Sequence, residues 1–225
     1  MAEVTVKTKE AMMPFGKKER RLLLDPLNDN NPITVQVLGI CSALAVTTLL
    51  NKAIVMSIAV VFVTAFANLI TSILRMYIPK QVRMIVQLII IAALVTIVEL
   101  TLKAVNYNIY KELSVFIGLI ITNCIVMGRL EAFAMANNPW RSFLDGIGNG
   151  VGYGIILIAV AAIRELFGKG SLLGFKIVGP TSDFLLTIPG YAPNNLMVLF
   201  PSAMFVIGVL IWMHRSFNSK LVDVS

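Results

Sequence analysis

Charged residues divide this chain into six long apolar runs, and this division limits its fold more than any other feature. The runs cover roughly residues 33–50, 54–74, 84–102, 113–128, 146–167 and 196–213. A helix that crosses the hydrocarbon core of a bilayer needs ~20 residues, and a backbone in lipid must satisfy its own hydrogen bonds. We therefore expect an all-α integral membrane protein with six transmembrane helices. The helices would form one membrane domain over residues 31–215, between a polar basic tail at 1–30 and a short tail at 216–225.

The composition excludes a soluble globular domain and a nucleic-acid-binding face. Hydrophobic residues make up 57% of the chain and charged residues 14%, and the mean hydropathy is +0.84. Such a chain has too little polar surface to cover a globular core in water. The formal net charge is +7, but Lys and Arg stand at the ends of the apolar runs. Nucleic-acid binding needs these residues gathered on one element, so we expect contact with membrane lipid and no nucleic-acid partner.

The distribution of Lys and Arg predicts the orientation in the membrane. With the N-terminus in the cytoplasm and six crossings, the cytoplasmic side takes both tails and two of the connections between helices. Of the 19 Lys and Arg residues, 13 then lie on the cytoplasmic side and 6 on the opposite side. Because cytoplasmic segments carry an excess of positive charge, we expect both termini in the cytoplasm.

The six runs divide into two sets of three, and the first run of each set is unusual. Runs 33–50 and 113–128 are short, contain glycine, carry polar residues at the centre and hold the two cysteines, Cys41 and Cys124. Because three helices separate these runs, the second set enters the membrane from the opposite side. Short, interrupted segments at matching positions of two halves indicate a site near the bilayer midplane. We therefore expect two inverted three-helix repeats, with helices one and four short or broken near the midplane.

Cys41 and Cys124 are candidate metal ligands, although a simpler interpretation exists. A single cysteine in a membrane segment more often acts as a small hydrophobic residue. The matched placement of two cysteines favours a shared site, and we expect neither to form a disulfide because both lie in apolar runs. An iron–sulfur cluster takes four protein thiolates. A chain with two cysteines could therefore hold such a cluster only if another chain supplied the rest.

Glycines repeat at every second position where the fifth run begins, in DGIGNGVGYG. Gly146, Gly150 and Gly154 recur every four residues, and Gly148 and Gly152 form a second stripe. Such stripes let neighbouring membrane helices approach closely, so we expect helix packing here. A nucleotide-binding loop is the alternative, but no G-x-G-x-x-G is present and no strand is expected before the glycines.

Several charged residues lie next to the apolar runs or inside them. We interpret them as side chains at helix ends, in contact with lipid headgroups. No chain of carboxylates crosses the apolar core, so this chain alone does not resemble an ion channel or a proton path. The residues are Glu99, Arg129, Glu131, Asp145, Arg164 and Glu165.

Three stretches of the sequence closely resemble one family of membrane proteins. They are NNPITVQVLGICSALAVTT, GLIITNCIVMGRLEAFAMANNPWRSFLDGIGNGVGYG and RELFGKGSLLG, and the likeness runs from about Asn30 to Trp212. They resemble the D-subunit family of the Na⁺-translocating NADH:quinone oxidoreductase (Nqr), whose sister family is the E subunit of the ferredoxin:NAD complex Rnf. Rnf members tend to have Pro after the first Cys, where this chain has Ser42, and to lack GIGNGVGYG. Both differences favour Nqr.

This resemblance implies one subunit of a six-subunit enzyme in the bacterial inner membrane. Another subunit oxidises NADH in the cytoplasm, electrons pass through flavins and iron–sulfur centres to ubiquinone, and Na⁺ is pumped outward. The D and E subunits of Nqr have opposite topology, and each gives two Cys to an intramembrane iron site, read as a [2Fe-2S] cluster. The matching residues here are Cys41 and Cys124. Related subunits bind covalent flavin through Thr in an S-G-A-T-like motif, which this chain lacks, so we expect no covalent flavin on it.

The resemblance also suggests a role for the polar residues beside the thiols. We infer that Ser42, Thr122 and Asn123 donate hydrogen bonds to cluster sulfurs, since such donors tune the reduction potential of a cluster. The sequence thus predicts a membrane electron-transfer subunit of a sodium-translocating NADH:quinone reductase, with no complete active site of its own. Three other interpretations remain: a subunit of an Rnf-type ferredoxin:NAD complex, a small inverted-repeat secondary transporter with a substrate at the midplane, and a structural subunit that only packs.

Overall fold

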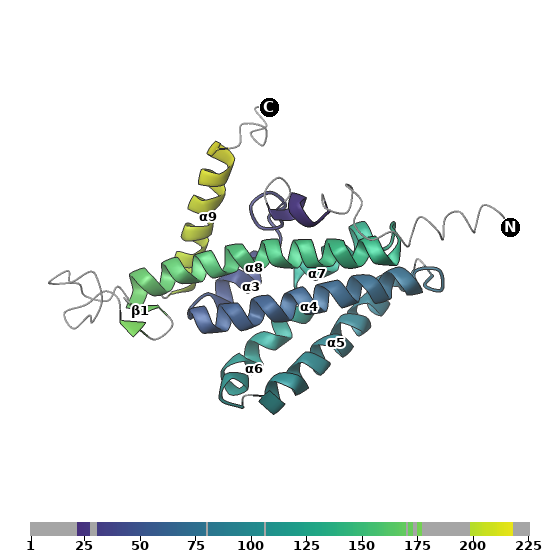
Figure 1. The fold of residues 1–225 in the computed structure, drawn as a ribbon, viewed down its shortest axis with the longest axis horizontal. Coiled ribbons are helices and arrows are strands. Elements are labelled where there is room, and N and C mark those ends of the chain that lie inside the picture. The colour runs from purple at the N-terminus through teal and green to yellow at the C-terminus, as the bar shows by residue number, and fades with distance from the viewer. Residues whose placement is uncertain are drawn as a thin grey trace.

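The computed structural model of the chain describes residues 22–27, 31–79, 81–105, 107–169, 171–172, 175–176 and 199–217. These residues are almost entirely helical (Figure 1). In chain order the helices are η1 (a 3-10 helix, Asp25–Leu27), α3 (Ile40–Val46), α4 (Leu50–Leu74), α5 (Arg83–Val105), α6 (Tyr107–Ile121), α7 (Cys124–Arg129), η2 (a π-helix, Leu130–Ala134), α8 (Pro139–Lys169) and α9 (Phe200–Phe217). Two short antiparallel strands, β1 (Ser171–Leu172) and β2 (Phe175–Lys176), lie between α8 and α9.

Four helical stretches are long and apolar enough to cross a membrane. These are Leu50–Leu74, Arg83–Val105, Phe116–Ala134 and Pro139–Gly168. The outer face of α5 exposes Ile85, Ile89 and Ile97, as expected of a surface that contacts lipid. The helical membrane fold predicted from the sequence is therefore confirmed for the described residues, while the six-crossing inverted repeat stays a prediction.

Helices α4 and α8 lie side by side along much of their length and form the centre of the fold (Figure 1). With 25 and 31 residues, both exceed the ~20 that a bilayer crossing requires. The two backbones approach closely because glycines of α8 face α4. The facing pairs are Gly146 with Ala65, Gly150 with Val61, and Gly154 with Ser57. A Cβ atom added at Gly146 or Gly150 would lie 2.8 Å from the Cα atom of the facing residue, so a larger side chain does not fit there.

The second glycine stripe of α8 faces the segment that precedes the membrane helices. A Cβ atom added at Gly148 would lie 2.7 Å from the carbonyl oxygen of Leu22. The buried Asn31 ties this segment to α8, because its Nδ2 donates to the Gly152 carbonyl oxygen over 3.2 Å. The last part of the predicted N-terminal tail is therefore packed on α8, whereas most of both predicted tails lies outside the described residues.

The first apolar segment is helical only over the seven residues of α3. Val37 and Gly39, just before this helix, have positive φ angles of 57° and 78°. These angles turn the chain sharply, and at Val37 they are uncommon because a β-branched residue avoids them. Behind the helix, Thr47 Oγ1 donates to the Ala43 carbonyl oxygen over 2.6 Å, and α4 then begins at Leu50. A short helix is therefore present where the sequence predicted the first short helix.

The fourth apolar segment is broken at its polar residues. Helix α6 ends just before Thr122 and Asn123, and α7 begins at Cys124. Asn123 is the N-cap of α7, because its Oδ1 accepts a hydrogen bond from the Ile125 backbone N–H over 3.3 Å. Helix α7 then continues directly into η2. The break thus lies inside the segment that the sequence predicted to be short or broken.

Candidate functional site

The two cysteines stand at the starts of the two short helices. Cys41 is the second residue of α3, and Cys124 is the first residue of α7. Both thiols are free and exposed, whereas the adjacent Ser42 and Ile125 are buried. A purely structural cysteine in an apolar segment would be expected inside the core. The two thiols are instead presented at the surface of this chain, open to a group outside it.

The starts of α3 and α7 pack against each other. Gly39, just before α3, faces the side chain of Ile125, the residue after Cys124. A Cβ atom added at Gly39 would lie 2.6 Å from Ile125 Cδ1, and the φ of 78° at this position also favours glycine. The fold therefore joins the two cysteine-bearing segments, which are far apart in the sequence.

The three polar residues beside the thiols have different surroundings. Thr122 is exposed. Asn123 is only 3% exposed, and its Nδ2 has no hydrogen-bond partner among the described residues. Ser42 is also buried, and its Oγ lies 2.9 Å from the Gly39 carbonyl oxygen and 2.7 Å from the Tyr153 hydroxyl. The Asn123 side chain also lies close enough to the Tyr153 hydroxyl to interact with it, and the Ser42 hydroxyl is engaged. Donation to cluster sulfurs stays a prediction for all three polar residues.

The thiols of this chain would supply part of a metal site. Within the part of the chain that the structure describes, no group of three or more His, Cys, Asp and Glu side chains could hold a metal ion. An iron–sulfur cluster takes four protein thiolates, and two exposed thiols on adjoining helix starts are suited to be half of that set. Hydrogen-bond donors around such a centre orient and tune it, and the buried Asn123 amide beside Cys124 is a candidate for this role. The residues present therefore fit a cluster for which another chain would have to supply the remaining thiolates.

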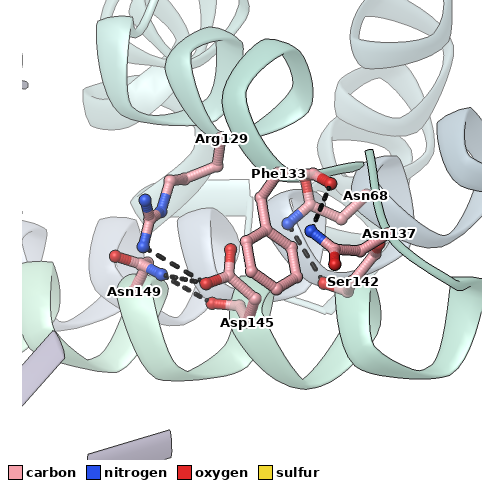
Figure 2. Close-up of polar contacts among 7 residues, drawn as sticks. All are labelled: Asn68, Arg129, Phe133, Asn137, Ser142, Asp145 and Asn149. Carbon is pink, nitrogen blue, oxygen red and sulfur yellow. Dashed lines mark hydrogen bonds and ion pairs between the residues drawn. The ribbon is translucent and has the colours of Figure 1, made fainter. Parts of the chain in front are cut away.

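A partly buried ion pair connects α7 with α8 (Figure 2). Arg129 Nη2 lies 3.2 Å from Asp145 Oδ1, and Asn149 Nδ2 donates to the same oxygen over 3.0 Å. The side chains of Arg129 and Asp145 are only 13% and 2% exposed. The prediction that these two charges contact headgroups is therefore wrong. Helix α8 begins at Pro139, before the apolar run, so Asp145 lies within the packed helix rather than ahead of it.

Several buried polar atoms without hydrogen-bond partners lie near this ion pair, where α8 packs against α4. Asn68 Nδ2 donates to the Ser142 carbonyl oxygen over 3.1 Å (Figure 2). Asn68 Oδ1, Ser142 Oγ and Asp145 Oδ2, although buried, have no hydrogen-bond partner among the described residues. Buried atoms of this kind are few in native proteins. The interior is thus unusually polar where α4, α7 and α8 meet.

Arg164 and Glu165, near the C-terminal end of α8, bind the break between α3 and α4. Arg164 Nη1 donates to Thr47 Oγ1 over 2.5 Å, and Glu165 Oε2 accepts from the Leu50 backbone N–H over 2.7 Å. Both residues are buried, at 1% and 3% exposed. The predicted headgroup contact is wrong here too, because the break leaves helix-end groups that need partners inside the fold. Positive charge at the end of α3 and negative charge at the start of α4 also match the two helix dipoles.

Comparison with known proteins identifies the family of this chain. A family model described as "Rnf-Nqr subunit, membrane protein" matches residues 20–211. The chain belongs to the Rnf-Nqr family. The D subunit of the Na(+)-translocating NADH-quinone reductase of Pasteurella multocida (strain Pm70) is 56% identical over 211 residues, which cover 94% of this chain and 100% of that relative. The D subunits of the same enzyme from Proteus mirabilis (strain HI4320) and Shewanella baltica (strain OS155) are 56% and 54% identical, and each match covers 94% of this chain and 99% of the relative.

The Rnf-Nqr match includes both cysteines, and the family resemblance seen in the sequence is confirmed. One residue of the candidate site was not predicted from the sequence. Tyr153, the hydroxyl partner of Ser42, stands between Gly152 and Gly154 in a stretch interpreted only as a packing surface. A single large polar side chain among those glycines was the available signal.

Proposed function

We propose that this Rnf-Nqr protein is a membrane electron-transfer subunit of a Na⁺-translocating NADH:quinone reductase. Cys41 and Cys124 would bind an iron–sulfur centre, read as a [2Fe-2S] cluster, together with two thiolates of a neighbouring subunit. The observation that carries the proposal is the exposure of two free thiols at the adjoining starts of α3 and α7. Such a centre supplies one-electron transfer inside the membrane when it is bound.

The residues of this chain would hold their half of the site in place. Helices α3 and α7 are short, with seven and six residues, so each thiol stands at a helix start rather than along a helix side. The close contact of Gly39 with Ile125 sets one helix start against the other. The buried Asn123 Nδ2 lies next in the chain to Cys124 and would donate a hydrogen bond to the bound centre.

The names of the relatives support an assembly with further subunits. Three relatives at 54–56% identity are each named as the D subunit of a Na(+)-translocating NADH-quinone reductase. We propose that this chain assembles with the other Nqr subunits, and that the E subunit, of opposite topology, gives the remaining two thiolates. The complex would pass electrons from cytoplasmic NADH to ubiquinone and move Na⁺ across the bacterial inner membrane. No covalent flavin is proposed on this chain.

Replacement of either thiol tests the proposed function. Cys41→Ala or Cys124→Ala, introduced singly, should abolish NADH-driven quinone reduction by the assembled complex and remove the iron and acid-labile sulfide of the shared centre. Loss of one thiolate of four displaces or destabilises the centre. NADH oxidation by an artificial acceptor should survive, because that chemistry is assigned to another subunit. Metal analysis and the two activity assays measure these outcomes.

Ser114→Ala is a suitable control for the cysteine variants. Ser114 is an exposed small residue of α6, so its replacement should change neither the iron content nor quinone reduction. A purely packing role for the thiols predicts a similar result for them, with a loss of about 1 kcal/mol in stability and nearly normal turnover. An assembled Cys124→Ala complex with unchanged iron content and quinone reductase activity would therefore contradict the proposal.

A further inference from the structure

Tyr153 lies on α8 at the place where the two cysteine-bearing segments meet. Its side chain is 0% exposed, and it is one of the largest fully buried side chains among the described residues. Its hydroxyl lies 2.7 Å from Ser42 Oγ, although the two residues are 111 positions apart in the sequence. A hydroxyl in an apolar interior is costly without such a partner. Helix α8 is thereby bonded to the residue that follows Cys41.

The direction of the hydrogen bonds at Ser42 follows from its single proton. Ser42 Oγ also lies 2.9 Å from the carbonyl oxygen of Gly39. A carbonyl oxygen only accepts, so the Ser42 proton goes to Gly39. Tyr153 must then donate its own proton to Ser42 Oγ. The result is a one-directional chain of two hydrogen bonds, from Tyr153 through Ser42 to Gly39.

The Tyr153 ring contacts the same place as this hydrogen-bond chain. A Cβ atom added at Gly39 would lie 3.2 Å from Tyr153 Cε2 and 2.6 Å from Ile125 Cδ1. Gly39 therefore fits between the ring and the residue that follows Cys124. Tyr153 thus contacts Ser42 and Gly39, which lie on either side of the Cys41 region. Through Gly39 it is also linked to Ile125, at the start of the helix that carries Cys124.

We propose that Tyr153 is a positioning residue, which fixes the Cys41 thiol relative to the Cys124 thiol through Ser42 and Gly39. The inference rests on the proposed function, because a fixed spacing matters only if both thiols bind one centre. Residues that orient metal ligands by hydrogen bonds typically change metal affinity or activity ~10–100-fold when they are replaced. The buried chain from Tyr153 to Gly39 is an arrangement of this kind.

Filling of the core accounts for the Tyr153 ring but not for its hydroxyl. Tyr153→Phe keeps the ring and its contact with Gly39 and removes the hydroxyl, which interacts with Ser42 and with Asn123. Ser42→Ala removes the acceptor from the other side. If the hydrogen-bond chain positions the thiol, the two variants and their combination should have the same effect, because each breaks the same chain.

The first test measures the spacing of the thiols themselves. The assembled complex carries Tyr153→Phe, Ser42→Ala or both, and iron is removed with a reductant and a chelator. A short bifunctional thiol reagent then cross-links Cys41 to Cys124, and peptide mass spectrometry identifies the product within one chain. We expect the cross-linking rate to fall by roughly threefold or more in all three variants, the scale of one lost buried hydrogen bond.

The matched control is Tyr110→Phe. It removes a tyrosine hydroxyl that donates to Glu99 over 3.0 Å, in α6 and α5, and that has no contact with the hydrogen-bond chain. Cross-linking in this variant should equal that of the unsubstituted complex. Equal cross-linking in Tyr153→Phe as well would overturn the positioning role.

The second test is the midpoint potential of the centre in the intact complex, followed by its electron paramagnetic resonance signal. We expect a shifted potential in Tyr153→Phe and in Ser42→Ala and no shift in Tyr110→Phe, since a residue that only fills volume would not change the potential.

If Cys41→Ala removes no iron, the proposed function fails, while the cross-linking still decides the role of Tyr153. If Tyr153→Phe does not assemble, Ser42→Ala, which deletes one oxygen atom, decides alone.

Discussion

At the scale of single residues, Arg129 and Asp145 show how opposite charges are kept inside an apolar chain. Their side chains are 13% and 2% exposed, and Asn149 adds a second donor to the carboxylate (Figure 2). Removing two charges from water is costly, and their attraction offsets part of that cost. Removing one partner is more costly still, because the other charge then remains buried and unpaired. The two residues therefore contribute to stability as a unit.

Arg129→Met should lower the free energy of unfolding by about 3 kcal/mol, since it leaves the Asp145 carboxylate with only the Asn149 amide as a partner. Adding Asp145→Asn to this variant should recover most of the loss, because no buried charge remains. Denaturant titration of the purified protein in detergent measures both effects. A single variant as stable as the double variant would show that the carboxylate does not depend on Arg129.

At the scale of elements, the backbones of α8 and α4 are in close contact at the glycines of α8. The variant Gly150→Ala tests whether this contact stabilises the fold. A Cβ atom at this position would lie 2.8 Å from the Val61 Cα atom, and a backbone atom cannot move aside without shifting the helix. We expect a loss of about 1–3 kcal/mol in stability, as for other overpacked sites. Gly118→Ala in α6 is the control, because nothing lies within 4 Å of the added Cβ atom there. Thermal unfolding of both variants in one detergent gives the comparison, and an undiminished Gly150→Ala stability would refute the close approach.

The helices could be predicted from the sequence where apolar residues alone define them. Helices α4 and α5 begin and end within a few residues of two apolar runs, and the break after α6 follows from the polar pair Thr122 and Asn123. The inward-facing charges could not be predicted, because their partners are distant in the sequence. Glu165, for example, binds Leu50 at a separation of 115 positions. The local sequence around a charged residue at the end of an apolar run is the same in both cases. It does not show whether the side chain contacts a lipid headgroup or the unpaired backbone groups at the end of another helix.

At the scale of the whole molecule, the candidate site depends on the meeting of three segments. The matched runs predicted Cys41 and Cys124 as a pair, but no local pattern shows that Gly39 packs on Ile125. The hydrogen bond between Tyr153 and Ser42 joins residues 111 positions apart, and no sequence pattern predicts it. Candidate ligands can thus be predicted from the sequence, whereas the residues that pack against them are seen only in the folded chain.

The orientation of the whole molecule gives the last prediction. Of the 19 Lys and Arg residues, 13 lie on the side of the termini if the chain crosses the membrane six times, and this excess predicts that both termini are cytoplasmic. Four apolar stretches are long enough to cross the membrane. Six crossings therefore require that the segment around α3 and helix α9 also cross it. The number of crossings and the side of the C-terminus are therefore linked.

Reporter fusions test the two together. Alkaline phosphatase fused after Ser225 should be inactive and a fluorescent protein fused there should fluoresce, because that end is predicted to be cytoplasmic. Phosphatase inserted after Val105, between α5 and α6, should be active, because that connection is predicted to lie outside. Each crossing reverses the side of the chain, so the loss of one crossing after Val105 would change only the C-terminal result. Active phosphatase at both sites would thus contradict the six-crossing arrangement, and inactive phosphatase at Val105 would contradict either the orientation or one of the three crossings predicted before it.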